Sequence, residues 1–107
     1  LMQDELSSCS SKEPFALQVL GDSMAPEFPD KCMIIIEPAD WCQSGMYVMV
    51  MLEGERWFRQ YIKDEAGERL VAVNDLYPDI PLADLEWKPE GIIMQRNIRR
   101  KVKHYKY

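Results

Sequence analysis

Turn-forming residues interrupt this 107-residue chain so often that only short strands fit between them. Turn and hairpin signals occur at Gly21-Asp22, at Glu53-Gly54-Glu55 and at residues 64–68. The turns stand about 8–12 residues apart, and no segment keeps helical periodicity for three turns. We expect strands at residues 15–20, 32–36, 46–52, 56–63, 70–73 and 91–95. This spacing predicts an all-β fold of several short, coiled antiparallel sheets around a barrel-like core.

The chain length and the apolar content of 47% fit one folded domain. We expect a flexible leader or linker at residues 1–14, the domain at residues 15–96 and a basic tail at residues 97–107. All 18 Asp and Glu residues precede residue 91, whereas six of the 13 Lys and Arg residues lie in residues 96–107. An acidic body does not bind nucleic acid by itself. The tail could contact phosphate, stay solvated, or pair as a last strand against the body.

Three protein classes are disfavoured by the sequence. The longest apolar run, Met46 to Leu52, is far shorter than the roughly 20 residues that a membrane helix needs. The three cysteines form no CxxC pair, and the only histidine, His104, lies in the tail, so we expect neither a metal site nor a cofactor. An odd number of cysteines fits no complete disulfide framework, and reduced thiols favour a cytoplasmic location.

The segment Gly21-Asp22-Ser23-Met24 is the sharpest candidate site. A serine on a turn after a strand can be exposed, and the backbone N–H groups beside it can face a developing oxyanion. Ser23 is therefore a candidate nucleophile, with Gly21, Asp22 and Met24 in the oxyanion turn, although a serine that caps a short helical turn is the alternative. A serine nucleophile needs a base. Because His104 lies in the basic tail, a Ser–Lys dyad is the remaining option, and the lysine must be buried to stay neutral.

Residues 17–31, Leu-Gln-Val-Leu-Gly-Asp-Ser-Met-Ala-Pro-Glu-Phe-Pro-Asp-Lys, resemble the start of the S24 peptidase domain, the family of the LexA repressor, phage repressors and the polymerase subunit UmuD. The resemblance covers roughly residues 15–96. Its further elements are the apolar strand at residues 33–36, the strand after Gly45, the hairpin at residues 53–55, Asn74 with Tyr77 and Pro78, and the strand that begins at Gly91. It implies a LexA-like fold with Ser23 as the nucleophile.

The chain departs from the family at the base. In the family the base is a lysine four residues after the hairpin glutamate, and in this chain that position is Arg59. Arginine is not deprotonated in proteins, so it cannot accept the Ser23 proton, although it could hydrogen-bond Ser23 or stabilise an oxyanion. Lys63 lies on the same strand face but roughly 13 Å away, and Lys31 is a weaker substitute. The family also cleaves an Ala-Gly or Cys-Gly bond upstream of the serine, where this chain offers only Cys9-Ser10.

We therefore predict an S24 domain that is catalytically weak or inactive. It would act as the dimerisation or regulatory domain of a phage-repressor-like transcription regulator or of an SOS-type stress-response protein. The alternatives are an active serine peptidase or autopeptidase that uses Ser23, and a stand-alone UmuD-like accessory protein. The resemblance implies a homodimer, DNA contact only through a helix-turn-helix domain outside these residues, and a RecA-type or polymerase partner.

Overall fold

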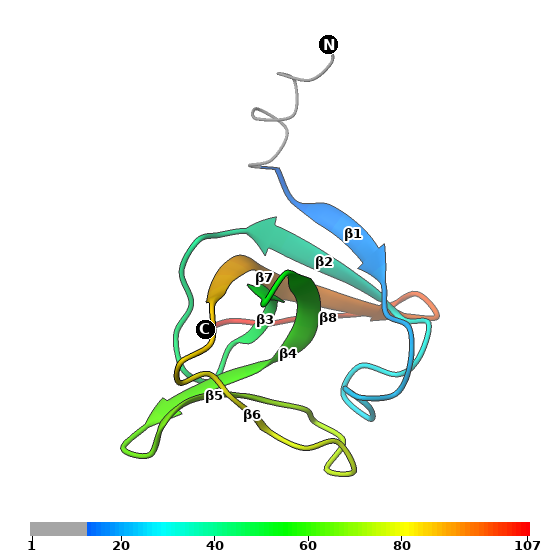
Figure 1. The fold of residues 1–107 in the computed structure, drawn as a ribbon. Coiled ribbons are helices and arrows are strands. Elements are labelled where there is room, and N and C mark those ends of the chain that lie inside the picture. Colours follow the sequence, from blue (N-terminus) through cyan, green and yellow to red (C-terminus); the bar gives the residue numbers. More distant parts are fainter. Residues whose placement is uncertain (1–12) are drawn as a thin grey trace.

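The computed structural model describes residues 13–107, which contain eight strands and no helix (Figure 1). The strands are β1 (Phe15–Gln18), β2 (Met33–Pro38), β3 (Tyr47–Leu52), β4 (Glu55–Asp64), β5 (Gly67–Val71), β6 (Ile80–Pro81), β7 (Trp87–Ile98) and β8 (Lys101–His104). They form one antiparallel sheet in the order β1-β2-β7-β3-β4-β5-β6, with β8 paired to β7. The predicted all-β fold is confirmed. It is built as one continuous open sheet instead of several short ones, and the sheet does not close into a barrel.

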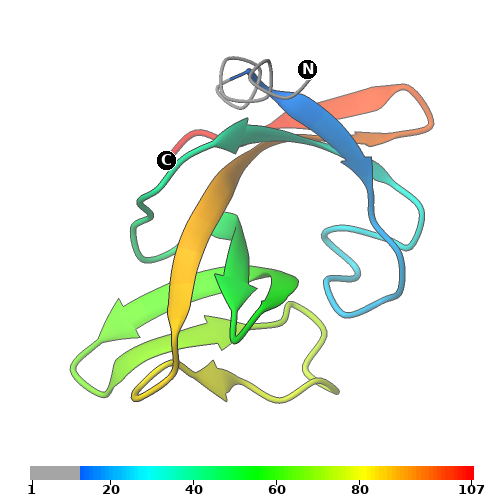
Figure 2. The ribbon, with the colours of Figure 1, turned by 45° about the horizontal axis from the view of Figure 1, so that its top comes forward.

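The long strand β7 bends the sheet. Its first part pairs with β3 and its later part with β2, and each of these ladders contains a β-bulge. Bulges increase the local twist, and here they lie near the point where β7 passes from one partner to the other. A Cβ atom at Gly91 would lie only 2.4 Å from Ile36 Cγ2, so the close approach of β2 requires glycine. As a result the sheet curls, and the loop after β1 reaches into the space between its two ends (Figure 2).

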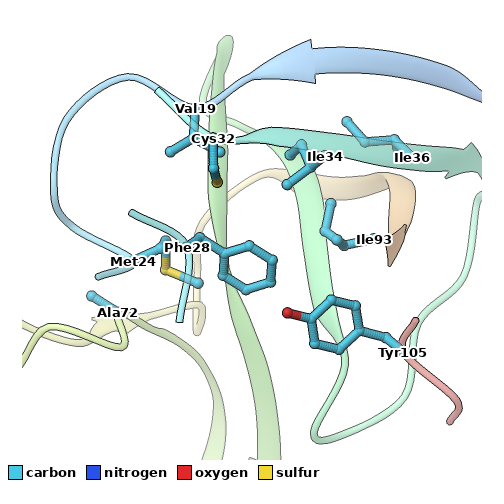
Figure 3. Close-up of a cluster of buried hydrophobic side chains, with 9 residues drawn as sticks. All are labelled: Val19, Met24, Phe28, Cys32, Ile34, Ile36, Ala72, Ile93 and Tyr105. Carbon is cyan, nitrogen blue, oxygen red and sulfur yellow. The ribbon is translucent and has the colours of Figure 1, made fainter. Parts of the chain in front are cut away.

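One hydrophobic cluster lies where this loop meets the sheet (Figure 3). The loop supplies Met24 and Phe28, both fully buried. The Phe28 ring packs edge-on against Tyr47 and Phe58, with centroid distances of 5.0 and 4.9 Å, and it is 5.4 Å from the Tyr105 ring. The buried members are Val19, Met24, Phe28, Cys32, Ile34, Ile36, Ala72, Ile93 and Tyr105. Two anchors on the loop that carries Ser23 therefore hold it against the sheet.

A second hydrophobic cluster lies against the other face of β3. Val48, Val50 and Leu52 alternate along β3 and are buried in this cluster, whereas Tyr47 and Met49 pack against the first one. Both faces of a strand that separates two cores must be apolar, which explains the uninterrupted apolar run in this segment. The remaining buried members are Met46, Tyr61, Leu70, Leu82 and Ile92.

The basic C-terminal segment is part of the sheet. The boundary expected at residue 96 falls inside β7, and β8 pairs with it through residues 101–104, so the last-strand alternative is the one observed. The following residue, Tyr105, is buried in the first cluster. Its hydroxyl and Lys103 Nζ both donate to Glu27 Oε2, at 2.6 and 2.7 Å. The predicted leader falls almost entirely in residues 1–12, outside the described part of the chain.

Candidate functional site at Ser23 and Arg59

The loop between β1 and β2 is tied together at its base. Val19 N–H donates to Cys32 O at 2.8 Å, and Lys31 N–H donates to Val19 O at 2.6 Å. Gly21 N–H donates to Asp30 Oδ1 at 2.7 Å across the loop. Gly21 has φ of 92°, a conformation in which glycine has no steric penalty. The Gly21 N–H is thus already used, so Gly21 shapes the turn and is not free to bind an oxyanion.

Ser23 sits on a tight turn inside this loop. Ala25 N–H donates to Asp22 O at 3.1 Å, and Phe28 N–H donates to Met24 O at 2.8 Å. These bonds run from i+3 and i+4, so the segment makes turns but no regular helix. Met24 is fully buried, whereas its neighbour Ser23 is half-buried and lines a cleft.

A second loop, between β5 and β6, braces the Ser23 turn from outside. Asn74 N–H donates to Ser23 O, and Asn74 Nδ2 donates to Asp22 O, both at 3.1 Å. Tyr77 OH donates to Asp22 Oδ1 at 2.6 Å, and this bond with the Asp22 charge raises the pKa of Tyr77. Asn74 and Tyr77 were part of the family resemblance but received no role there. The structure shows that they position the turn.

Arg59 reaches Ser23 from the middle of β4. Its Nη1 donates to Ser23 Oγ at 3.0 Å and to Phe58 O at 2.9 Å. The residue is only 8% exposed, which makes it the one buried charged residue in the described part of the chain. Burial lowers the pKa of the Arg59 guanidinium and outweighs the opposite effect of nearby Tyr77. Arginine nevertheless stays protonated in proteins, so this group donates to Ser23 and cannot take its proton.

The other contacts of Arg59 are aromatic. Its Cζ lies 5.1 Å from the centroid of the Trp57 ring and 5.8 Å from that of Tyr77. Arg59 Nε is buried and has no hydrogen-bond partner. Within residues 13–107, no carboxylate lies within the 4.0 Å of an ion pair with Arg59. Cation–π contacts compensate only part of the cost of burying a charge.

A cleft of about 470 Å³ opens beside these two side chains. Ser23 and Arg59 line it together with Leu17 from β1, Ile34 from β2 and Met49 from β3. A second hollow of about 300 Å³ shares Leu17, Met49 and Arg56 with the first and continues along β1. The site therefore offers a serine hydroxyl and a guanidinium at one end of an elongated, largely apolar surface.

The alternative basic residues lie apart from Ser23. Lys63 is exposed near the end of β4, four residues beyond Arg59, which corresponds to roughly 13 Å along a strand. Lys31 is exposed at the base of the loop, next to β2, and His104 is exposed on β8. The strand register therefore brings Arg59 to Ser23, and not Lys63. Sequence reasoning did not identify Trp57 as part of the site. Its place on the same face as Arg59, two residues earlier on β4, was the available signal.

Comparisons with known proteins identify the family of the chain. The Peptidase S24-like family model matches residues 3–94, and the chain belongs to this family. A curated relative is the LexA repressor of Corynebacterium efficiens, which is 28% identical over 87 residues. The match covers 80% of this chain but only 38% of that repressor. Within residues 13–107, the structure has no helix of the length and apolar character needed to cross a membrane.

Proposed function

We propose that this S24 peptidase-like domain is hydrolytically weak or inactive and acts as the dimerisation or regulatory domain of a transcription regulator. The observation that carries the first part is the 3.0 Å hydrogen bond from Arg59 Nη1 to Ser23 Oγ. A serine nucleophile must lose its proton to a base as it attacks. Here the group beside its oxygen is a permanent donor. Arg59 thus occupies the position of the base but cannot accept the Ser23 proton.

The regulatory part of the proposal rests on similarity. The relative whose match covers 80% of this chain is named a repressor. The match spans about two fifths of the length of that repressor. By the family resemblance, DNA contact would come through a helix-turn-helix domain, with this domain setting the geometry of a homodimer. An SOS-type or phage-repressor context, a RecA-type or polymerase partner and a cytoplasmic location belong to the same proposal. A strict monomer at tens of micromolar in sedimentation velocity would contradict the dimer.

One observation favours a second candidate, an active serine peptidase. The Ser23 hydroxyl lines an open cleft, and no hydrogen bond to an acceptor within residues 13–107 uses the N–H groups of Ser23 and Met24. Two free N–H groups beside a serine are what an oxyanion hole requires. In this reading Lys63 would have to approach Ser23 as the base, because Arg59 cannot play that role.

Labelling of Ser23 by a serine-reactive fluorophosphonate tests whether the domain is hydrolytically weak or inactive. Intact mass is measured after treatment of wild type, Ser23→Ala and Arg59→Lys. We expect no adduct on wild type and a single adduct on Arg59→Lys, because a buried lysine can become neutral and act as the base. An adduct on wild type that is absent from Ser23→Ala would overturn the proposal. Its loss in Lys63→Ala would then assign the base to Lys63.

A further inference from the structure

We propose that the cleft beside Ser23 binds the C-terminal carboxylate of a peptide, with the Arg59 guanidinium as its counter-charge. This inference rests on the proposed loss of hydrolytic activity, because it assigns a binding role to Ser23 and its cleft. It is carried by the environment of Arg59, by the unused donors around Ser23 and by the shape of the cleft.

Arg59 is a buried cation that lacks an anion. Its contacts are a hydroxyl, a carbonyl and two aromatic rings, all of them neutral. Removing a charged group from water without a partner is costly, and a carboxylate would repay that cost most fully. Nε also lacks an acceptor, but it is buried, so it adds to the cost of placing the charge here and does not face a ligand in the cleft. Nη1 already donates to Ser23 Oγ and Phe58 O, so the donor that remains for a carboxylate in the cleft is Nη2.

Additional donors surround the same point. Ser23 Oγ accepts its hydrogen bond from Arg59, so the hydroxyl hydrogen remains available to a ligand. The N–H groups of Ser23 and Met24 find no acceptor within residues 13–107. The cleft therefore presents the Ser23 hydroxyl and the Arg59 guanidinium, and no acidic side chain of the described residues pairs with Arg59. Hydrogen bonds from such donors to a carboxylate are about twice as strong as neutral ones.

The cleft fits the end of an extended peptide. Its walls carry the apolar side chains of Leu17, Leu20 and Met49, which suit an apolar last residue. The second hollow continues this surface past Phe15 and Pro38. β1 is the terminal strand of the sheet and pairs only with β2 within residues 13–107, so its other edge can bind an added strand through main-chain hydrogen bonds.

The position of Ser23 favours a chain end over an acidic side chain. In a serine peptidase the group placed against the serine oxygen is a main-chain carbonyl carbon. A guanidinium at that point favours the charged form of the group, which is a terminal carboxylate, over the neutral carbonyl of a continuing chain. Binding would resemble that of a cleaved peptide, without a cleavage step.

Affinity selection with defined peptide pools tests this assignment. The full chain is immobilised and exposed to N-acetylated random pentapeptides, one pool with free C-terminal acids and the other with C-terminal amides. The most enriched acid is then made in both forms for titration. We expect the acid to bind about 10- to 100-fold more tightly than its amide. It should also shift the Arg59 Nε–Hε signal in the NMR spectrum. Equal affinity of the two forms would overturn the proposal, and so would amides with internal Asp or Glu that bind as tightly as acids.

Matched arginine variants locate the carboxylate. Arg59→Gln should remove the preference for the acid. Arg69→Gln should keep it within about twofold, because Arg69 lies on β5 outside both hollows and is paired with Asp64 at 3.0 Å. Arg56 lines the cleft itself, where it is exposed and paired with Glu90 at 2.8 Å. Arg59→Lys serves in case Arg59→Gln does not fold. A bound carboxylate favours the protonated form of the lysine, so this variant should still prefer the acid but bind it more weakly. Loss of the preference in Arg56→Gln alone would place the anion at the mouth of the cleft and contradict the proposal.

The labelling experiment separates the two proposals. If wild type takes no phosphonate adduct and binds acid and amide equally, the carboxylate site is wrong while the loss of hydrolysis stands. If wild type is labelled at Ser23, the loss of hydrolysis is wrong, and the carboxylate site falls with it because the cleft then serves a reacting carbonyl.

Discussion

Two arginines among residues 13–107 have a buried Nε without a hydrogen-bond partner, yet their surroundings differ. Arg96 on β7 donates through Nη1 to Glu27 O at 2.6 Å, and the same nitrogen lies 3.3 Å from the Glu27 carboxylate. Arg59 on β4 contacts a hydroxyl, a carbonyl and aromatic rings only. The chain thus compensates the charge of Arg96 internally and leaves that of Arg59 to neutral groups. Arg96 is therefore placed to stabilise the fold, whereas the surroundings of Arg59 are those that the proposed carboxylate site requires.

The largest expected effect comes from removing the compensated arginine. Arg96→Met would leave the Glu27 carboxylate without one partner and a backbone carbonyl without its donor. We expect the free energy of unfolding to fall by about 2 kcal/mol, less than for a fully buried pair because both side chains are partly exposed. Urea unfolding measures it, with Lys101→Met on the exposed β8 as the control, which should change stability by under about 0.5 kcal/mol. A change for Arg96→Met as small as the control would remove the contrast between the two arginines.

The carboxylate of this network gives a pH-dependent test. Burial of Glu27 would raise its pKa, but hydrogen bonds from Lys103 and Tyr105 and the charges of Lys103 and Arg96 outweigh it, so the pKa lies below the ordinary 4.5. A depressed carboxyl pKa contributes stability above the unfolded value and loses it as the pH falls through the folded value.

Glu27→Gln should therefore be less stable than wild type by about 1.5 kcal/mol at pH 7. The gap should narrow as the pH falls below about 4.5, where the wild-type carboxyl protonates. Thermal or urea unfolding from pH 7 to 3 measures it, and Glu37→Gln on the exposed part of β2 is the control. A gap that stays constant over this range would show that the Glu27 charge does not stabilise the fold.

Most of the strands could be predicted from turn signals and alternation, but the two-residue β6 was missed, and β7 and β8 could not be predicted in full. β7 begins at Trp87 and runs through Pro89, a residue that argues against a strand. It is tolerated there because the ladder with β3 shifts register between Met49 and Val50, directly beside the proline. The turn before β8 places Arg99 and Arg100 at φ of 49° and 72°, where glycine or asparagine is the usual signal.

The site could be predicted only in part, because some of its contacts join segments that are far apart in the sequence. The resemblance placed Ser23 and Arg59 in one site, and the structure brings their side chains within hydrogen-bonding distance, while their chemical roles stay proposals. The bracing of the Ser23 turn by Asn74 and Tyr77 joins segments more than 50 residues apart through an irregular loop. No local periodicity predicts such a contact, because it depends on how the curled sheet brings the two loops together.

The same substitution at Arg59 gives the most direct comparison of the two arginines. Arg59→Met keeps most of the side-chain volume and removes a buried charge that has no anion, so we expect the free energy of unfolding to rise by about 1 kcal/mol, opposite in sign to Arg96→Met. Both variants replace an arginine on a strand by methionine, and both are measured by urea unfolding. They differ chiefly in whether the chain supplies a carboxylate that pairs with the arginine. A loss of stability as large as that of Arg96→Met would mean that the Ser23 hydroxyl, the Phe58 carbonyl and the aromatic rings compensate the charge fully. A gain would mean that the fold tolerates Arg59 at a cost, as expected for a residue retained to bind an anion and not to stabilise the sheet.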